Sequence, residues 1–529
     1  MRPLFAALVI TAAAQTPVTY ERILNAPREP GNWLTYGGDY RSYHYSALDQ
    51  VNAGNVQRLR AKWIYQMHRP KVETTPIVVD GIMYVTRPPS DVLALDAETG
   101  RALWSYEHRI SSRVYTCCGE VNRGLAMLGT TLYLTSLDAK LIALDARSGR
   151  VLWRKDIADP AMNYTATGAP LVVKDKLIVG IAGAEGGIRG FLDGYSPKTG
   201  ERLWRLWTVP APGEPGSETW GGDSWKNGGG STWTTGSYDP ELNLVYWGTG
   251  NPGPDYNGDV RPGDNLYTCS LLALDPDSGK LKWYFQFTPH DTRDWDATQV
   301  PVLLDSTVGG RPRKIVVVPN RNGYYYVLDR ATGEFLFNKP YVKVTWAKEF
   351  DKKGRPVMNP NQEPTLEGND SIWPGVDGAN NWMSPSYSPQ TGLLYFNARE
   401  ERRRFFKTDA PEFRPGESFF GGGGGGGARF RPEESWGKLI GMVPETGDIK
   451  WEHRIAAPPW AGVLATRGYL VFSATPSGNF YALDARTGKE LWHFNGGDRV
   501  HASPITFLSR GKQVISIAIG DLLIAFALD

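Results

Sequence analysis

A short repeat constrains this chain more than any other feature of its sequence. It reads D-x-x-[ST]-G or a close variant, and the fourth residue after the glycine is aromatic. Aspartate and glycine at fixed offsets are typical of a tight turn, and the flanking runs alternate and are rich in β-branched residues. Each unit therefore predicts a strand, a turn and a second strand carrying the aromatic residue. The units end at Trp104, Trp153, Trp204, Trp283, Phe337, Trp451 and Trp492, and Trp63 adds an eighth terminal aromatic residue without the turn.

The spacing of the repeats predicts the architecture. The tryptophans at 104 and 153 lie 49 residues apart, those at 153 and 204 lie 51 apart, and those at 451 and 492 lie 41 apart. Such distances are typical of four-stranded propeller blades. The wider gaps, 79 residues from 204 to 283 and 114 from 337 to 451, must hold insertions or degenerate blades.

We therefore predict an all-β protein, an eight-bladed β-propeller of four-stranded antiparallel blades joined by tryptophan-docking repeats. Residues 15–529 are expected to form this single domain. The segment 33–46 is expected to complete a blade begun by the C-terminus, which closes the ring. The glycine run at 421–427 is predicted to be a mobile surface loop without chemistry.

Charge and the N-terminus limit the classes of function. Lys+Arg 58 against Asp+Glu 56 gives a net charge of +2, so no strong field favours nucleic acid or an anionic membrane. Residues 1–14 combine Arg2, a short apolar run and small residues, which is the layout of a signal peptide. The run is too short to span a bilayer. We expect export to the periplasm and a mature chain without a membrane span.

The cysteines pose a separate question, because two of the three are adjacent. Neighbouring Cα atoms lie about 3.8 Å apart, whereas an ordinary disulfide prefers roughly 4.4–6.8 Å. A bond between Cys117 and Cys118 would close almost no loop, so stability is not its purpose, and a chance pair of buried thiols is the alternative. Three cysteines and seven histidines offer no C-x-x-C-H haem site and no zinc constellation.

The blade repeat resembles that of the quinoprotein dehydrogenases, which hold pyrroloquinoline quinone (PQQ). It also resembles the cofactor-free outer-membrane assembly lipoprotein, so residues outside the repeat must distinguish an enzyme from a scaffold. The stretch CCGEVNRG resembles the C-C-x-x-V-N-R-G motif of the family's methanol and ethanol dehydrogenases. That resemblance implies that a Cys117–Cys118 disulfide lies against one face of the quinone and that Arg123 binds a cofactor carboxylate.

Further stretches resemble the family's contact segments in chain order. They are VETTPIVVDG, NYTATGAP with GAEGG, NGGGSTWTTG, NPGPDYN, TPHDTRDWDATQVP, PNRNGYYYV, GANNWMSP and PPWAGVLAT. The cofactor-binding residues implied by these stretches are Glu73, Thr167, Gly183, Ala184, Ser231, Trp233, Arg321, Asn381 and Trp460. The implied metal ligands are Glu185, Asn251 and Asp294, and Asp294 is also the implied catalytic base.

The run Asp294-Trp295-Asp296 bears on the metal. Asp296 resembles the additional aspartate of the lanthanide-type relatives, where the calcium type usually has alanine. A third carboxylate favours a trivalent over a divalent cation by Coulomb attraction, so we expect a lanthanide(III) rather than Ca²⁺. The alternatives are that Asp296 hydrogen-bonds a backbone amide, or that it corresponds to the similar D-x-D of the glucose-dehydrogenase branch.

The resemblance implies a periplasmic enzyme that oxidises a primary alcohol or a related alcohol or aldehyde. Asp294 would take the alcohol proton while hydride passes to PQQ, and a metal ion would polarise the quinone. Because no haem motif is present, the electrons are expected to pass to a separate soluble cytochrome c. A quinoprotein of the sugar or polyol branch and a cofactor-free propeller scaffold are the alternatives.

Overall fold

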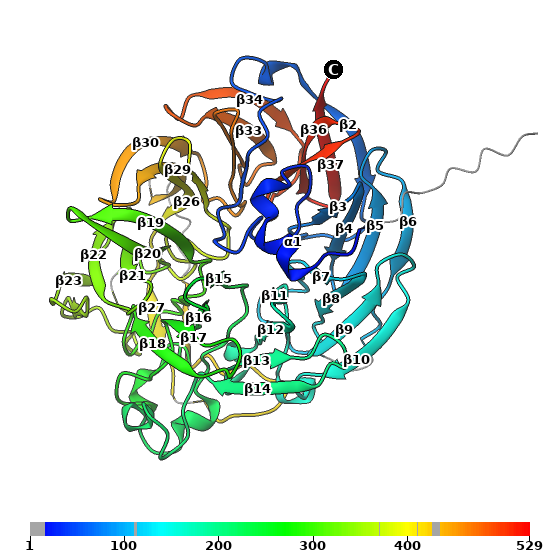
Figure 1. The fold of residues 1–529 in the computed structure, drawn as a ribbon. Coiled ribbons are helices and arrows are strands. Elements are labelled where there is room, and N and C mark those ends of the chain that lie inside the picture. Colours follow the sequence, from blue (N-terminus) through cyan, green and yellow to red (C-terminus); the bar gives the residue numbers. More distant parts are fainter. Residues whose placement is uncertain (1–15, 111–113, 370, 410, 426–433) are drawn as a thin grey trace, which may run out of the picture.

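The computed structural model describes residues 16–110, 114–369, 371–409, 411–425 and 434–529. These residues form eight antiparallel sheets arranged around a common centre (Figure 1). Seven of the sheets have four strands, and the eighth gains a short fifth strand at its edge. The predicted eight-bladed β-propeller is therefore confirmed. The predicted signal peptide, residues 1–14, lies outside the described residues, so it stays a prediction.

The first four blades follow one another along the chain. Blade 1 contains β3 (Ile77–Val79), β4 (Ile82–Arg87), β5 (Asp91–Asp96) and β6 (Ala102–Tyr106); blade 2 contains β7 (Ala126–Leu128), β8 (Thr131–Thr135), β9 (Lys140–Asp145) and β10 (Val151–Asp156); blade 3 contains β11 (Leu171–Val173), β12 (Lys176–Gly180), β13 (Phe191–Tyr195) and β14 (Arg202–Trp207); blade 4 contains β15 (Ser237–Asp239), β16 (Leu244–Gly248), β17 (Ser270–Leu274) and β18 (Leu281–Gln286).

The other four blades complete the ring. Blade 5 contains β19 (Val302–Val308), β20 (Arg311–Pro319), β21 (Tyr324–Asp329) and β22 (Phe335–Pro340); blade 6 contains β25 (Ser386–Ser388), β26 (Leu393–Glu401), β29 (Ser435–Val443) and β30 (Asp448–Ile455); blade 7 contains β31 (Leu464–Thr466), β32 (Leu470–Ala474), β33 (Asn479–Asp484) and β34 (Glu490–Asn495); blade 8 contains β35 (Ile505–Ser509), β36 (Lys512–Ile519), β37 (Leu522–Leu528) and β2 (Leu59–Gln66).

The repeat motif joins most of the blades to the next one. The ring of Trp104, on the outer strand of blade 1, covers the turn glycine of blade 2, Gly149, where a Cβ would lie 2.5 Å from it. The same indole donates its Nε1–H to the carbonyl of Ala146 in that turn at 3.1 Å. Equivalent indole-to-carbonyl bonds start from Trp63, Trp204, Trp283 and Trp451. The glycine is needed for its positive φ of 70° and for the space that the indole fills.

Closure of the ring differs in detail from the prediction. Blade 8 is completed by β2, where Trp63 pairs with Ala525 of β37, and not by the segment 33–46. That segment instead runs along the inner strands, and its β1 (Tyr45–Ser46) adds a parallel strand to β31 of blade 7. Buried and exposed side chains alternate along β2, as expected of an outer strand. In segment 33–46, by contrast, only the two residues of β1 belong to a strand.

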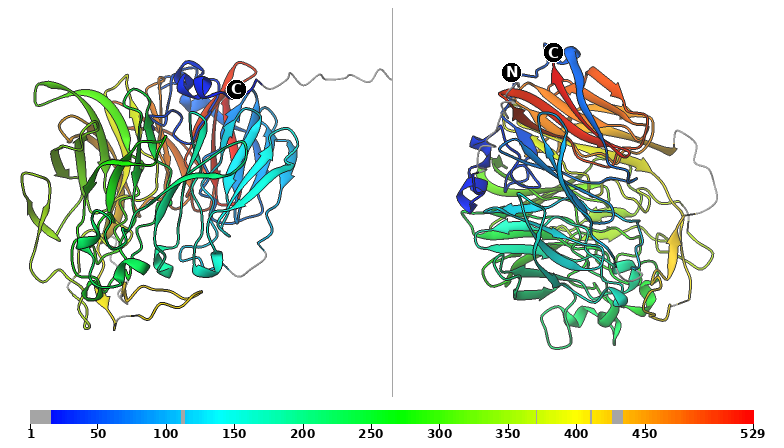
Figure 2. Two further views of the ribbon diagram at one scale, coloured as in Figure 1. Left: turned by 60° about the horizontal axis from the view of Figure 1, so that its bottom comes forward. Right: turned by 90° about the vertical axis from the view of Figure 1, so that its right-hand side faces the viewer.

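The N-terminal segment covers one end of the ring. The short helix α1 (Tyr20–Leu24) is capped by Thr19, whose hydroxyl accepts from the Arg22 amide. Val18 bridges to Gly129 in the turn between β7 and β8. Figure 2 shows α1 at one face of the propeller and the inserted segments at the other. The connections that lead into each first strand and from each second to third strand lie at that other face.

The wide gaps between repeats hold insertions and no extra blade. The longest gap contains the strand pair β23 (Ala347–Phe350) with β24 (Pro356–Met358), and the pair β27 (Phe405–Lys407) with β28 (Gly422–Gly424). The glycine run 421–427, predicted to be a mobile surface loop, is therefore a paired strand at 422–424, while residues 426–427 lie outside the described ranges. The remaining short 3₁₀ turns are η1 (Ala26–Arg28), η2 (Val56–Arg58), η3 (Pro160–Met162), η4 (Ala184–Gly186), η5 (Ser217–Thr219), η6 (Ser224–Asn227) and η7 (Gly258–Val260).

No helix within the described ranges has the length and apolar character needed to cross a membrane.

The docking contact predicts the effect of a single methyl group. Gly149→Ala should lower the free energy of unfolding by about 2–4 kcal/mol, because it combines a left-handed residue with a clash against Trp104. Gly129→Ala is the matched control, since it has a similar φ of 65° but nothing within 4 Å of an added Cβ. The control should cost only about 1–2 kcal/mol. Urea denaturation of both variants tests this, and equal losses would contradict a role for the docked indole.

Candidate active site

A cavity of about 600 Å³ opens at the face that carries the inserted segments. Connections from all eight blades contribute residues to its wall. The predicted residues that line it are Glu73, Cys117, Cys118, Arg123, Thr167, Gly183, Glu185, Trp233, Asp294, Asp296, Arg321, Asn381 and Trp460. Ala184, Ser231 and Asn251 are not on the wall: Ser231 and Asn251 are buried beside Asp296, and Ala184 lies next to Glu185 in η4. The structure thus brings the predicted set together, while the role of each residue stays a prediction.

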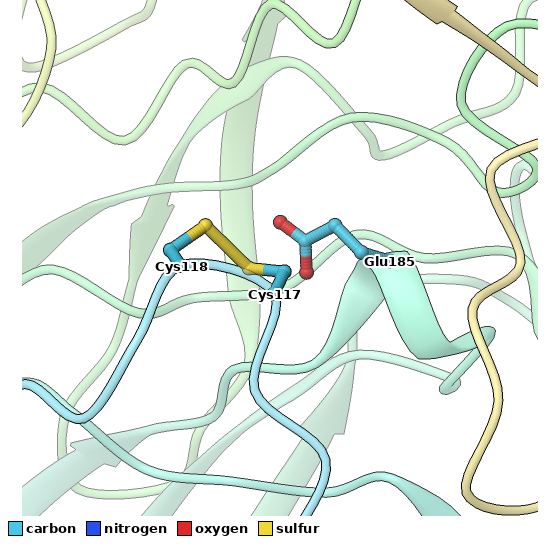
Figure 3. Close-up of side chains that lie close together, drawn as sticks. All are labelled: Cys117, Cys118 and Glu185. Carbon is cyan, nitrogen blue, oxygen red and sulfur yellow. A yellow bond between two sulfur atoms is a disulfide. The ribbon is translucent and has the colours of Figure 1, made fainter.

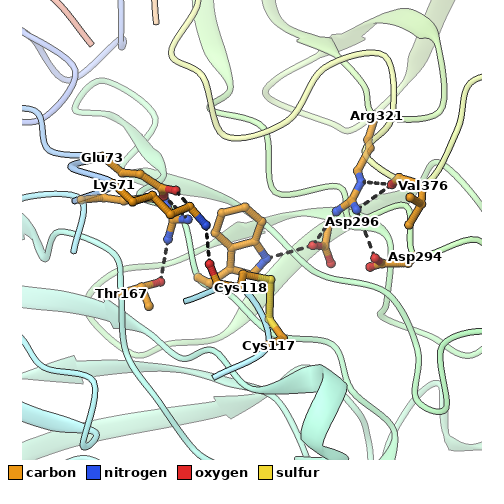
Figure 4. Close-up of a disulfide and its surroundings, with 11 residues drawn as sticks. Lys71, Glu73, Cys117, Cys118, Thr167, Asp294, Asp296, Arg321 and Val376 are labelled. Atoms are coloured by element: carbon orange, nitrogen blue, oxygen red, sulfur yellow. Dashed lines mark hydrogen bonds and ion pairs between the residues drawn. A yellow bond between two sulfur atoms is a disulfide. The ribbon is translucent and has the colours of Figure 1, made fainter. Parts of the chain in front are cut away.

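The two adjacent cysteines are joined by a disulfide at the mouth of this cavity. Both are exposed, and the Lys71 ammonium donates to the carbonyl of Cys118 (Figure 4). The Glu185 carboxylate approaches the pair, and the ligand atoms of the three residues lie within 4.8 Å of one another (Figure 3). Because the sulfurs are bonded to each other and are not thiolates, this trio is not a metal centre.

Arg123 and Trp233 form one side of the cavity. The Arg123 guanidinium pairs with Glu73 at 2.6 Å and donates to the Thr167 hydroxyl at 2.8 Å. Its central carbon lies 4.5 Å from the centre of the Trp233 ring. The Trp233 indole N–H donates to Asp296 at 3.0 Å, which fixes the plane of the ring.

Arg321 organises two of the acidic groups. It contacts Asp294 at 3.2 Å and Asp296 at 2.9 Å, as Figure 4 shows. Asp296 is fully partnered, since it also accepts from the Trp233 indole and from the Asn251 backbone amide at 2.8 Å. Asp294 has a left-handed backbone with φ 60°, and its Oδ1 has no hydrogen-bond partner among the described residues. Strain of this kind at a polar residue is typical of a functional site.

The acidic groups are held in an environment that opposes their charge. Burial raises the pKa of Glu185 to about 7, and Asp296 adds to the rise. Burial also raises the pKa of Asp294 well above its usual value, although Arg321 acts in the opposite direction. A cation among these oxygens would relieve the repulsion that keeps protons on them.

Two residues near the cavity were missed by the sequence reading. Asp255 is fully buried, and the charge of Glu185 is one cause of its strongly raised pKa, after burial itself. Its signal in the sequence was an aspartate four positions after Asn251. Trp382 stacks on Trp460 with ring centres 4.6 Å apart, and it follows Asn381 directly. Its signal was a second tryptophan in one of the contact segments.

Comparison with known proteins gives this arrangement a family. A family model described as PQQ, glucose/ethanol/alcohol dehydrogenase, beta-propeller domain, matches residues 33–349 and 431–515. The chain belongs to this family of PQQ-dependent alcohol dehydrogenases. The predicted Cys117–Cys118 disulfide of that family is present, so this prediction is confirmed.

The similarity to individual relatives extends over nearly the whole chain. Quinoprotein alcohol dehydrogenase PedH of Pseudomonas putida is 39% identical over 98% of this chain and 92% of its own length. The crystal structure of the quinohemoprotein alcohol dehydrogenase from Comamonas testosteroni has a TM-score of 0.90 at 35% identity and covers 97% of this chain and 82% of that one. A europium-containing methanol dehydrogenase has a TM-score of 0.89 at 33% identity, covering 96% of this chain and all 100% of that one.

The residues of the cavity fit the family's cofactor and a metal ion. Buried polar atoms on its wall lack partners among the described residues, namely Arg123 Nε, Asp294 Oδ1, Asn381 Oδ1 and Trp382 Nε1. Such atoms need a polar ligand. PQQ carries three carboxylates on a flat ring, which suits arginine donors beside an indole face. Unpartnered carboxylate and amide oxygens are the donors that hard cations prefer.

The exposed position of the disulfide at the cavity predicts that the bond serves activity more than stability. A Cys117→Ala/Cys118→Ala variant should keep the free energy of unfolding within about 1 kcal/mol, because the bond closes no loop. Its dye-linked alcohol oxidation should fall roughly 10–100-fold, because a flat ligand loses one of its two walls.

Melting curves and activity of the same preparation test this pair of expectations. Glu120→Ala, an exposed change in the same loop, is the control and should alter neither quantity. A large loss of stability with activity intact would show that the bond serves the fold.

Proposed function

We propose that the protein is a periplasmic, metal- and PQQ-dependent dehydrogenase that oxidises primary alcohols or related alcohols and aldehydes. The observation that carries the proposal is the state of Asp294. One of its oxygens is held by Arg321, while the other is unpartnered in the wall of the cavity. A carboxylate fixed at one oxygen and free at the other is arranged to accept a proton from a bound hydroxyl group.

The wall of the cavity would hold the cofactor. Trp233 offers a flat face, and the Cys117–Cys118 disulfide offers the opposite one. Arg123 and Arg321 supply charged donors for carboxylate and quinone oxygens. The side chains of Thr167, Ser231, Asn381 and Trp460 and the contact of Glu73 with Arg123 complete the predicted set.

The residues of this chain account for the proton. Asp294 Oδ1 takes the hydroxyl proton of the alcohol as the carbon–hydrogen bond breaks, which leaves the aldehyde. PQQ, held by the wall residues, would supply the hydride acceptor, and a cation held by the acidic residues would supply a Lewis acid. Arg321 keeps Asp294 oriented, and the Trp382–Trp460 stack lines the cavity. The proton and the electron pair of the alcohol are thereby both assigned an acceptor.

The metal ion would bind among Glu185, Asn251, Asp294 and Asp296. The Asn251 side-chain oxygen is buried and has no partner within the described ranges, so it is available as a ligand. Three carboxylates against the single guanidinium of Arg321 leave an excess of negative charge. We therefore infer a lanthanide(III) ion rather than Ca²⁺.

Location and electron transfer are inferred from the sequence. An exported protein can keep the Cys117–Cys118 disulfide, which supports the periplasmic assignment. The sequence contains no C-x-x-C-H motif, so we propose a separate soluble cytochrome c as the electron acceptor. Nothing in a net charge of +2 favours nucleic acid as a partner.

Neutralising the proposed base tests the reaction. Asp294→Asn should lower the turnover rate roughly 10²–10⁴-fold, because it removes the proton acceptor but keeps the size of the side chain. PQQ should remain bound, as measured by its absorbance after removal of free cofactor.

The matched control is Asp498→Asn, the same change at an exposed aspartate on the rim of the cavity. It should turn over like the parent. Parent-like turnover in Asp294→Asn loaded with PQQ would rule Asp294 out as the base.

The metal assignment is tested by reconstitution. Metal-free protein loaded with PQQ should oxidise alcohols at least about tenfold faster with a light lanthanide than with calcium, because the stronger Lewis acid suits the more negative ligand set. Asp296→Ala should lose most of the lanthanide-supported rate. Equal or better activity with calcium in the unmutated protein would refute the lanthanide assignment.

A further inference from the structure

Asp255 is a buried carboxylate that the predicted ligand set does not use. It is 0% exposed, and neither of its side-chain oxygens has a hydrogen-bond partner among the described residues. A buried carboxylate is costly unless a cation, a proton or several donors compensate it. The one cation beside its backbone, Arg261, donates to the carbonyls of Pro254, Asp255 and Asp291. The carboxylate of Asp255 is thus left without a direct counter-charge.

Backbone hydrogen bonds from the segment between β27 and β28 place Asp255 next to the predicted metal ligands. The backbone amide of Phe419 donates to the carbonyl of Glu185 at 2.6 Å, and the amide of Tyr256 donates to the carbonyl of Phe420 at 2.9 Å. Phe419 and Phe420, which are consecutive in the segment between β27 and β28, therefore link the Glu185 segment to the Asp255 segment. Gly421 continues this contact, because a Cβ there would lie 3.1 Å from Pro254.

Asn251 and Glu185 both lie close enough to Asp255 to interact with its carboxylate. Asn251 lies four residues earlier in the N-P-G-P-D stretch, and its own Oδ1 is unpartnered. Its backbone is fixed by Asp296, which accepts from the Asn251 amide, and by Gly230, which donates to the Asn251 carbonyl at 2.9 Å. Buried oxygens of Asn251, Asp255 and Asp294 therefore lie in one region and have no hydrogen-bond partner among the described residues.

Asp255 differs from Asp296 in how its oxygens are used. Asp296 already accepts three hydrogen bonds, from Asn251, Trp233 and Arg321. A cation that binds Asp296 must compete with these donors, whereas the two side-chain oxygens of Asp255 accept no hydrogen bond from the part of the chain that the structure describes. Of the two additional acids, Asp255 therefore has the more available oxygens for a cation.

We propose that Asp255 is a further carboxylate ligand of the metal centre and that it increases the preference of the site for a trivalent cation. The inference rests on the proposed metal- and PQQ-dependent function. Attraction between a carboxylate and a cation grows with the charge of the cation, so one more carboxylate favours a lanthanide(III) over Ca²⁺. Ligand charge count is a general means by which oxygen sites adjust metal affinity.

Metal titration tests this ligand without relying on activity. Metal-free, PQQ-loaded protein is titrated with Tb³⁺, followed by its luminescence, and then with Ca²⁺ in competition. The parent is compared with Asp255→Asn and with Asp259→Asn, which neutralises an exposed aspartate of the same segment paired with Lys407. Asp255→Asn should weaken Tb³⁺ binding about tenfold or more and Ca²⁺ binding clearly less, whereas Asp259→Asn should change neither affinity.

Melting of the metal-free proteins provides the second readout. Asp255→Asn should melt no lower than the parent without metal, because it removes an uncompensated buried carboxylate. Its melting temperature should rise less than that of the parent when Tb³⁺ is added.

Three results would overturn the inference. Unchanged selectivity in Asp255→Asn with intact metal uptake would show that Asp255 is not a ligand. A lower metal-free melting temperature with equal losses for both ions would show that Asp255 supports the fold. Failure of the parent to take up either ion would refute the proposed metal dependence itself, and this inference with it.

Discussion

The rest of the structure depends on the contact between an outer-strand indole and the turn glycine of the next blade. The contact combines a hydrogen bond from the indole to a turn carbonyl with a ring that fills the space beside a glycine. Because the same contact recurs at five of the blade junctions, from Trp63, Trp104, Trp204, Trp283 and Trp451, it positions most sheets against a neighbour. The connections at one end then converge, and every blade contributes to one cavity.

The convergence of the blade connections has an electrostatic cost, because it brings several acidic side chains of the cavity region close together. Glu185, Asp255, Asp294 and Asp296 meet where the structure describes one directly paired cation, Arg321. Repulsion and burial together raise the pKa of Glu185 and of Asp294, with burial as the larger cause. A propeller without a ligand would gain nothing from this arrangement, whereas one that binds a cation gains affinity for it. The scaffold therefore gives up some stability in order to hold these acidic groups together at the site.

The sequence predicted those parts of the molecule that depend on fixed offsets between residues. Turn glycines and tryptophans recur because they meet physically, so the number of blades could be read from them. Residues 33–46 were misassigned as the closing strand because their aromatic pattern resembles a strand, whereas β2 carried the expected tryptophan without the turn. Gly422–Gly424 were read as a loop, since pairing with β27 depends on a distant segment. Asp255 was missed for a similar reason. It lies in an irregular stretch, and its segment is linked to Glu185 by backbone hydrogen bonds of the distant residues Phe419 and Phe420.

Asp296 links the flat wall of the cavity to its acidic region. One of its oxygens accepts from the Trp233 indole and from Arg321, and the other accepts from the Asn251 amide. The orientation of the aromatic wall, the position of Arg321 and the backbone of a proposed ligand therefore all depend on one carboxylate. This explains how Asp296 can matter to the metal through hydrogen bonds as well as through direct coordination. Positioning by Asp296 and coordination by a carboxylate with free oxygens are separate tasks, and Asp255 is the residue that we propose for the second.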